Sequence, residues 1–303
     1  MIRIYDHEVQ GGTVIKPLTG IEADAPSDAA VIKPIGTRGV KGIVLSNGIN
    51  PEYGKRDAYK MVWSVIDEAI RNAVAVGADP DRIAILDNFC WGDPLRPETM
   101  GSLVEACRGC HDAALFYGTP FISGKDSLNN EYLGADGQRH AIPPTLLISA
   151  IGIIHDINTA VTMDLKAADN LIYLIGDFLT EQKSVPDVQT LTPQVYRALH
   201  QAIQNGWVKS CHDLSEGGLA VTAAEMCIGG RLGLETNIIS NLFTEVNGCL
   251  LVEVAPTDAS KFEKQFTNLP LAKIGIVTSK PILKFADVEI SVEELVSAFN
   301  TPA

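Results

Sequence analysis

The chain has 303 residues, of which 46% are hydrophobic and 20% are charged, a globular balance that is enough for the cores of two ordinary domains and excludes disorder as the default. Its net charge of -13 argues against a protein that binds by neutralising nucleic-acid phosphates or an anionic membrane. The start, "MIRIYDHEVQGG", lacks the apolar core of a signal peptide, and no later run approaches the roughly 18 apolar residues of a membrane span. We therefore expect a cytoplasmic protein with neither nucleic acid nor membrane as a partner.

Apolar, β-like runs alternate with helical patterns up to about residue 155. The runs are "GVKGIVLSNG" (39–48), "RIAILDNF" (82–89) and "TLLISAIGIIH" (145–155). This alternation predicts an α/β domain.

The first long helical pattern covers residues 57–78 and ends at Gly77. One apolar face is predicted for it, made of Val62, Val65, Ala69 and Val76. A polar pair, Glu68 and Asn72, is one turn apart on the same side of this helix.

The next helical pattern, residues 97–118, contains "CRGCH", from Cys107 to His111. This spelling is shared with c-type haem attachment sites, and a C-x-x-C pair can also be a redox pair or half a zinc site. However, Leu103, Cys107, Cys110 and Ala114 have helical spacing, and no second C-x-x-C completes four ligands. We therefore predict that both thiols lie on the buried face of the helix as small hydrophobic groups.

A second domain is predicted after a polar bridge at residues 157–170. Strand-like runs follow at 171–178, 248–255 and 272–279. Between the first two of these runs, Thr192 as the cap, Pro193 at the first helical position and Gly206 at the end predict one helix.

The segment "CHDLSEGGLAVTAAEM" (211–226) predicts a helix whose start can bind an anion. Ser215 is placed to cap a helix beginning at Glu216, while Gly217 and Gly218 allow a ligand close to the free N–H groups. Asp213 stands where a carboxylate can hold Mg²⁺ against a phosphate. An ordinary capped helix with glycines for packing is an equally good interpretation of the pattern alone.

Two further segments carry polar groups next to apolar runs. In "ILDNFCWGDPLRPE" (85–98), Asp87 is predicted at the end of a strand, the edge where ligands bind in α/β proteins, although it and Asn88 can also serve a turn, with Arg96 paired to Glu98 on the surface. In "FISGKDSLNNEY" (121–132), only Gly124 and Lys125 fit the phosphate-loop template. We predict a bend there that binds phosphate or metal, or a plain surface turn.

Taken in order, five segments resemble one enzyme family. They are "YDHEVQGG" (5–12), "SDAAV" (27–31), "DNFCWGDPLRPE" (87–98), "SGKDSLNNE" (123–131) and "HDLSEGGLA" (212–220). Together they resemble the second half of the synthetase subunit of phosphoribosylformylglycinamidine synthase, over nearly the whole chain. The last segment alone is also typical of the wider aminoimidazole ribonucleotide synthetase superfamily.

The resemblance implies an α/β (α+β) fold with two domains. A linker or N-terminal extension would cover residues 1–19, an ATP-binding N-terminal-like domain 20–155, and a C-terminal-like α/β sandwich 156–303. In the family, the sheet of the first domain pairs with a like domain to form a shared barrel. We therefore expect the chain to form a homodimer through that exposed sheet.

The activity that the resemblance implies is that of an ATP-dependent ligase in purine biosynthesis. ATP and Mg²⁺ activate the amide oxygen of formylglycinamide ribonucleotide, and ammonia from a glutaminase partner then displaces phosphate. The family's catalytic histidine lies in the first half, and none of the six histidines here matches it, so the chain alone is expected to be inactive. The alternative is a free-standing nucleotide-binding dimer with a structural or regulatory role.

Two sets of residues carry family roles onto this chain. In the active site, Asp87 and Gly124 match ATP contacts, and Ser127 matches a substrate contact. Lys125 stands where many small-type members have an asparagine that serves a metal, so its role is open between that metal contact and a direct contact to phosphate. In an auxiliary nucleotide site, the metal ligands would be Asp28, Glu68, Asn72 and Asp213, and the nucleotide contacts Ser215 and Gly217. His212 is expected to orient the neighbouring Asp213.

Overall fold

The computed structural model describes residues 11–178, 184–238 and 240–301, and the first six residues of the segment "YDHEVQGG" lie outside them. The helices are α1 (Pro51–Gly54), α2 (Ala58–Ala75), α3 (Pro97–Tyr117), α4 (Thr192–Gln204), α5 (Gly218–Gly230), α6 (Ala259–Gln265) and α7 (Val292–Asn300), with short 3₁₀ turns η2 (Pro80–Arg82) and η3 (Ile157–Thr159). The strands are β1 (Thr13–Ile15), β2 (Ala30–Ile32), β3 (Gly42–Ile49), β4 (Ile83–Cys90), β5 (Phe121–Ser127), β6 (Glu131–Leu133), β7 (Arg139–Ala141), β8 (Thr145–Ile154), β9 (Leu171–Ile175), β10 (Val208–Asp213), β11 (Gly233–Thr236), β12 (Leu250–Val254), β13 (Leu271–Thr278), β14 (Ile282–Phe285) and β15 (Val288–Ser291).

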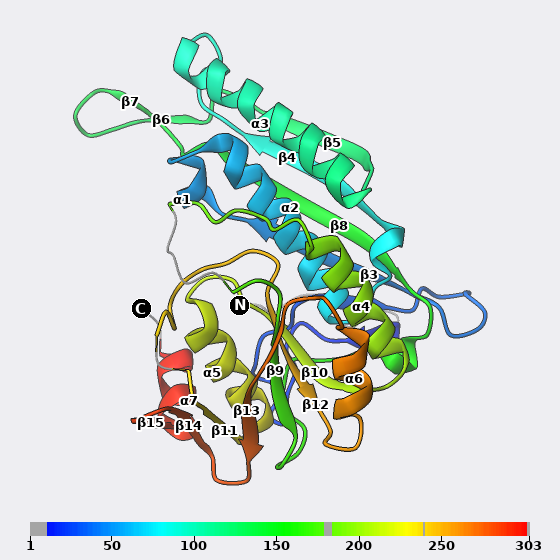
Figure 1. The fold of residues 1–303 in the computed structure, drawn as a ribbon. Coiled ribbons are helices and arrows are strands. Elements are labelled where there is room, and N and C mark those ends of the chain that lie inside the picture. The colour runs from blue at the N-terminus through cyan, green and yellow to red at the C-terminus, as the bar shows by residue number, and fades with distance from the viewer. Residues whose placement is uncertain (1–10, 179–183, 239, 302–303) are drawn as a thin grey trace.

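The first sheet has six strands in the order β1-β2-β3-β8-β4-β5, of which only β4 and β5 pair in parallel. Helices α2 and α3 cover one of its faces (Figure 1). The predicted apolar face of α2 is confirmed, because its four residues are at most 1% exposed. A side chain at Gly48 of β3 would clash with the backbone oxygen of Val65 and lie 2.9 Å from the Ala69 nitrogen, so glycine allows α2 to approach this strand closely.

The other face of the first sheet is apolar and open. Along β3 the side chains alternate between buried and exposed, so that Leu45, Asn47 and Ile49 lie on the open face, and Ile151 of β8 joins them. Within the described residues the sheet ends at β1 and β5 without closing into a barrel.

The second sheet has seven strands in the order β10-β12-β9-β13-β11-β14-β15. Helices α4 and α6 lie on one side of it and α5 and α7 on the other (Figure 1). Strand β9 shows why both sides are covered: Tyr173 and Ile175 face the core under α4 and α6, while Ile172 and Leu174 face the core under α5. The predicted α/β sandwich is confirmed.

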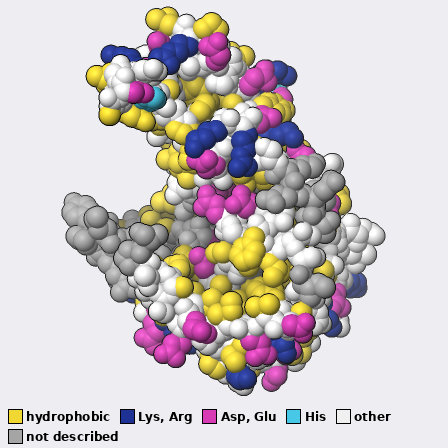
Figure 2. Space-filling model, turned by 90° about the vertical axis from the view of Figure 1, so that its left-hand side faces the viewer, with side chains coloured by type: hydrophobic (Ala, Val, Ile, Leu, Met, Phe, Trp, Pro, Cys, Tyr) yellow, Lys and Arg dark blue, Asp and Glu magenta, His cyan; other side chains and the backbone are white. Residues whose placement is uncertain are grey.

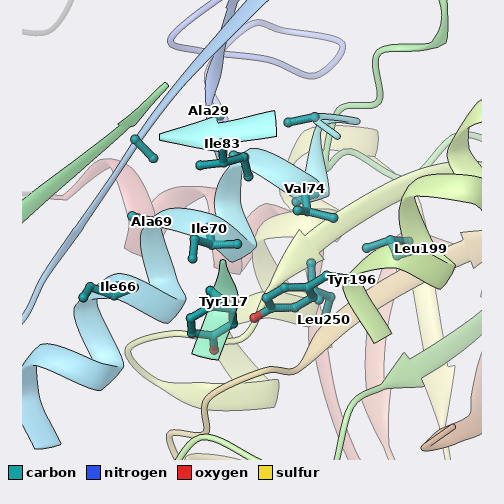
Figure 3. Packing of buried hydrophobic residues seen from close by; sticks show 14 of the residues in the cluster. Ala29, Ile66, Ala69, Ile70, Val74, Ile83, Tyr117, Tyr196, Leu199 and Leu250 are labelled. Carbon is teal, nitrogen blue, oxygen red and sulfur yellow. The ribbon is translucent and has the colours of Figure 1, made fainter. Parts of the chain in front are cut away.

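The two sheets share one continuous core around α2. Tyr117 of α3 and Tyr196 of α4 are stacked, with ring centroids 6.3 Å apart and planes at 11°, beside Ile66 and Ile70 of α2 (Figure 3). Burial across this junction fixes the position of α2 relative to β10 and α5 of the second domain.

The prediction for the two cysteines of α3 is wrong for one of them. Cys110 is 8% exposed, but Cys107 is exposed, because the buried face of α3 consists of Ala106, Gly109, Cys110, Ala113 and Tyr117. Burial, with the nearby Asp87, raises the pKa of the Cys110 thiol to about 12, so it stays protonated near neutral pH. Cys110 therefore behaves as a small apolar group.

The helix caps also differ from expectation. Thr192 is the first residue of α4, not its cap, and Leu191 at the cap position makes no side-chain hydrogen bond. Pro193 is accordingly the second residue of the helix instead of the first, while Gly206 follows the end of the helix as predicted, at φ +73°. Among the described residues, no helix combines the length and apolarity that a membrane crossing requires.

Candidate nucleotide and metal sites

The turn between β10 and α5 is built differently from the predicted capped helix. Helix α5 begins at Gly218, and Gly217 (φ +80°) takes the cap position without a side-chain bond. The Ser215 hydroxyl instead donates to the Asp213 carboxylate and accepts from Nη2 of Arg71 at 2.9 Å. The capping prediction is therefore wrong, since two successive residues with positive φ move the helix start past Ser215.

Asp28 and Asp213 meet across the domain junction. Oδ1 of Asp28, from the loop before β2, accepts the backbone N–H of Asp213 at 3.0 Å and contacts Nδ1 of His212 at 2.9 Å. One ligand atom from each of these three residues lies within 4.8 Å of the other two. The sequence prediction that paired Asp28 with Asp213 thus corresponds to a real cluster.

His212 was expected to orient Asp213, but it contacts Asp28 more closely. Its Nε2 lies 2.8 Å from Glu225 Oε2, whereas Oδ1 of Asp213 is 3.8 Å from its Nδ1. Burial opposes the imidazolium, but the Asp28 and Glu225 carboxylates outweigh it and raise the pKa of His212 well above its usual value. Both ring nitrogens of His212 therefore face carboxylates, and the doubly protonated ring donates to both.

The other two predicted metal ligands, Glu68 and Asn72, lie on α2 facing the same junction. Oε2 of Glu68 accepts the Ile49 N–H at 3.0 Å, and Nδ2 of Asn72 donates to the Asn47 carbonyl at 3.3 Å. Glu68 is not within the 4.8 Å cluster. We call Asp28, Glu68, Asn72, Asp213 and Ser215 the interdomain site.

These residues fit a hard divalent cation. Oδ2 of Asp28 and Oδ1 of Asn72 are buried and have no hydrogen-bond partner, and the Asp28 side chain is 0% exposed. A buried carboxylate oxygen without a donor is costly, and Mg²⁺ prefers carboxylate and amide oxygens of this kind. The orphaned oxygen of Asp28 is thus explained if a cation binds at its cluster with Asp213.

An acidic pocket opens beside the interdomain site. Its inner part is lined by Glu68, Arg71 and Ser215, and it continues past Tyr53 into a cavity of about 240 Å³. Glu216 and Glu245 line both parts. Acidic side chains are visible in the hollow between the two bodies of the molecule (Figure 2). A polyphosphate would enter this pocket favourably only with its charge neutralised by cations.

Burial changes the ionisation of the pocket's carboxyl groups. It raises the pKa of Glu68 to about 7; Arg71 offsets part of this effect, while Asp213 adds to it. The pKa of Glu216 is raised as well, by burial first and then by Glu245 and Asp213. Near neutral pH, Glu68 is therefore partly protonated until a cation favours its charged form.

We expect Glu68→Gln to stabilise the ligand-free protein at pH 8 more than at pH 5. Because the folded-state pKa of Glu68 is raised above the 4.5 that is ordinary for a glutamate, the folded state binds the proton more tightly, and stability falls as pH rises from 4.5 through about 7. Glutamine mimics the protonated form and lacks this loss. Urea unfolding at both pH values measures it, with the exposed Glu52→Gln as control; equal effects of Glu68→Gln at the two pH values would contradict the assignment.

The predicted active-site residues lie at the β5 edge of the first sheet. Strand β4 continues to Cys90, so Asp87 is inside the strand instead of at its end, and "FISGKDS" is strand β5 instead of a bend. Parallel pairing places Asp87 beside Gly124, and Oδ1 of Asp87 accepts the Lys125 N–H at 3.3 Å. Both local predictions were wrong for the same reason. They ended each strand at its last apolar residue, whereas the polar residues that follow continue the strand.

The structure divides these residues between the two faces of the sheet. Asp87 and Gly124 pair on the helix-covered face, near Cys110 of α3, whereas Lys125 and Ser127 alternate onto the open face. A Cβ on Gly124 would clash with the Asp87 carboxylate, at 2.8 Å from its Oδ2. We call Asp87, Gly124, Lys125 and Ser127 the strand-edge site.

The surface pair suggested for Arg96 is also different, because its Nη2 contacts Glu131 at 3.2 Å and not Glu98.

A more important residue, Arg71, was missed in the sequence. It is 2% exposed, and Asp67 four residues before it is 0% exposed. The sequence did contain a signal for this pair, namely two charges of opposite sign one turn apart within an otherwise apolar helical pattern.

Two protein-family models match this chain, one over the part that contains most of the first sheet and one over the part that contains most of the second. The profile of the AIR synthase related protein, N-terminal domain, matches residues 26–154, and that of the C-terminal domain matches residues 167–288. The chain belongs to the AIR synthase related family. The resemblance found in the sequence is thereby confirmed.

Two relatives in this family are named phosphoribosylformylglycinamidine synthase subunit PurL. The protein of Thermosynechococcus vestitus is 33% identical over 341 residues, covering 99% of this chain and 43% of the relative. The protein of Lactobacillus helveticus is 35% identical over 317 residues, covering 95% and 39%. The chain thus spans about two fifths of the length of these PurL proteins.

Solved structures show the same fold. PurLQS of Thermotoga maritima superposes with a TM-score of 0.74 at 17% identity, over 92% of this chain and 47% of that chain. The T. maritima PurL complexed with ATP gives 0.72 at 16% identity, over the same shares. A chain of the HypE–HypF complex gives 0.64 at 14% identity, over 88% of this chain and 92% of that chain. In that protein, one pair of such domains makes up nearly the whole chain.

Proposed function

We propose that this chain is the second half of a phosphoribosylformylglycinamidine synthase, an ATP-dependent ligase of purine biosynthesis. The observation that carries the proposal is the similarity to PurL proteins over 99% of this chain. In the proposed reaction, the amide oxygen of formylglycinamide ribonucleotide attacks the γ-phosphorus of ATP and ADP leaves. Ammonia then attacks the activated carbon, and phosphate leaves to give the amidine.

The strand-edge site would supply this half's part of the active site. Asp87 and Gly124 would contact ATP, where the absent Cβ of Gly124 leaves space beside the carboxylate. Ser127 and Lys125, on the open face, would contact the ribonucleotide substrate and a phosphate or metal. Because these residues lie at an exposed sheet edge, a partner surface must complete the site and exclude water.

The interdomain site would be an auxiliary nucleotide site. When bound there, Mg²⁺ would neutralise the phosphates of a nucleotide, held by Asp28, Glu68, Asn72 and Asp213. Ser215 and the backbone at Gly217 would contact the nucleotide itself. The orphaned oxygens of Asp28 and Asn72 support this assignment.

We propose the first half of the synthetase and a glutaminase that delivers ammonia as partners, in the cytoplasm. The domain division would be a 1–19 extension, 20–155 and 156–303. In the absence of the first half, the open face with Leu45 and Ile49 favours a homodimer in which two such faces form a shared barrel. Sedimentation at micromolar concentration tests this, and a monomer would contradict it.

An assay of the chain alone tests the proposed function. With ATP, Mg²⁺, ammonia and formylglycinamide ribonucleotide, we expect no product above background, and we expect product once the first half is added. Product from the chain alone would overturn the proposal that it is an incomplete half.

A second candidate is a free-standing nucleotide-binding dimer with a structural or regulatory role. The match to nearly the whole of the HypE–HypF chain favours it, because a single pair of these domains can be a complete protein. Nucleotide binding without any gain of activity on adding the first half would select this candidate.

A further inference from the structure

A buried arginine occupies one side of the Asp213 carboxylate. Nε and Nη2 of Arg71 donate to Asp213 Oδ2 at 3.2 and 3.1 Å, and Nη2 also donates to Ser215 at 2.9 Å. The Arg71 side chain is 2% exposed and that of Asp213 9%. The guanidinium therefore stands where a bidentate cation on Asp213 would otherwise bind.

Arg71 is fixed in this place by a fully buried counter-charge. Nη1 of Arg71 donates to Oδ2 of Asp67, which also accepts the Gly248 N–H at 2.9 Å. Oδ1 of Asp67 accepts the hydroxyls of Tyr117 and Tyr196 at 2.5 and 2.6 Å. Moving Arg71 aside would leave Asp67 as an uncompensated charge in the core, so Arg71 has no easy alternative position.

The other side of Asp213 faces the candidate cation position. Its Oδ1 lies 3.8 Å from Nδ1 of His212, the ring nitrogen that also contacts Asp28. The orphaned Oδ2 of Asp28 belongs to the same cluster. A cation held between Asp28 and Asp213 would thus share the Asp213 carboxylate with the guanidinium of Arg71, and two positive charges that share one buried carboxylate repel each other.

We propose that Arg71 is a positioning residue that acts through Asp213 to keep the interdomain site from binding a bare divalent cation tightly. Arg71 donates hydrogen bonds to Oδ2 of Asp213, so that only Oδ1 is available to bind the cation. Its guanidinium also adds a fixed positive charge beside the cation position. The site then favours a cation that arrives with an anionic phosphate, whose negative charge offsets that of Arg71. This inference rests on the proposed cation site.

Binding of Mn²⁺ alone, followed by the electron paramagnetic resonance signal of the free ion, tests the proposal. We expect the double variant Asp67→Asn/Arg71→Met, which removes one charge of each sign from the core, to bind Mn²⁺ at least tenfold more tightly than the wild-type chain. The single variant Arg71→Gln is a second design with the same expected direction. Arg71→Lys keeps the positive charge and should retain the weak wild-type affinity. A purely structural role for Arg71 would lower or leave unchanged the affinity in all three variants.

Asp28→Asn locates the effect. Added to either charge-removing variant, it should abolish the gain in Mn²⁺ affinity. If the Arg71 variants bind Mn²⁺ no more tightly while Asp28→Asn still weakens binding, the role of Arg71 is overturned and the cation site stands. If Asp28→Asn has no effect on Mn²⁺ binding in any background, the cation site and this inference are both overturned.

Discussion

Replacing Glu253 with leucine is expected to destabilise the protein by about 3 kcal/mol or more, one of the two largest effects that we predict. Glu253 of β12 is 0% exposed. Its carboxylate accepts hydrogen bonds from the backbone of Lys166 and Ala167, from Asn170 at 2.6 Å and from Ser210 at 2.7 Å. Leucine would leave these four donors without their acceptor, and two of them, on Asn170 and Ser210, are buried.

Urea unfolding measures this loss. Glu253→Gln retains one acceptor oxygen and should lose less than Glu253→Leu. A matched control is Glu235→Leu on β11 of the same sheet, where the side chain is 51% exposed and pairs with Lys284 at 3.2 Å. Because exposed ion pairs contribute little, the control should lose less than about 1 kcal/mol. Equal losses for Glu253→Leu and Glu235→Leu would show that the buried carboxylate is not an anchor.

Gly124→Ala is expected to lower the synthetase rate of the chain mixed with its first half by at least about 100-fold, with little effect on folding. The added methyl group would clash with the Asp87 carboxylate and displace it from the position proposed for ATP. The fold should survive because Gly124 is in an edge strand with exposed neighbours, so the Asp87 side chain can rotate away.

Gly101→Ala is the matched control, since a Cβ at Gly101 of α3 meets nothing within 4 Å. It should retain the full rate. A Gly124→Ala protein that is folded and equally active would remove Asp87 and Gly124 from the active site.

Much of the fold could be predicted from hydrophobic patterns. The six apolar runs that predicted strands correspond to β3, β4, β8, β9, β12 and β13. The buried face of α2 was predicted from the helical spacing of its apolar residues. The ends of elements could not be predicted, because polar residues continue β4 and β5 and because two glycines delay the start of α5. Local propensity does not contain the pairing between strands that decides where they end.

For the candidate sites, the sequence supplied residues but not their partners. Asp28 and Asp213 are 185 positions apart, and only the family resemblance brought them together before the structure did. Arg71 was missed because a charge in a helix pattern is ordinarily assigned to the surface. Its role depends on Asp67, Tyr117 and Tyr196, which come from three different helices.

The melting temperature of the chain with ADP and Mg²⁺ tests the central claim most directly. The interdomain site is contained within this chain, whereas the strand-edge site needs the first half, so ADP with Mg²⁺ should raise the melting temperature of the chain alone. Asp213→Asn should abolish the rise, Asp87→Asn should leave it intact, and Mg²⁺ without ADP should have little effect. A rise that disappears in Asp87→Asn but persists in Asp213→Asn, or no rise in the wild-type chain, would contradict the account.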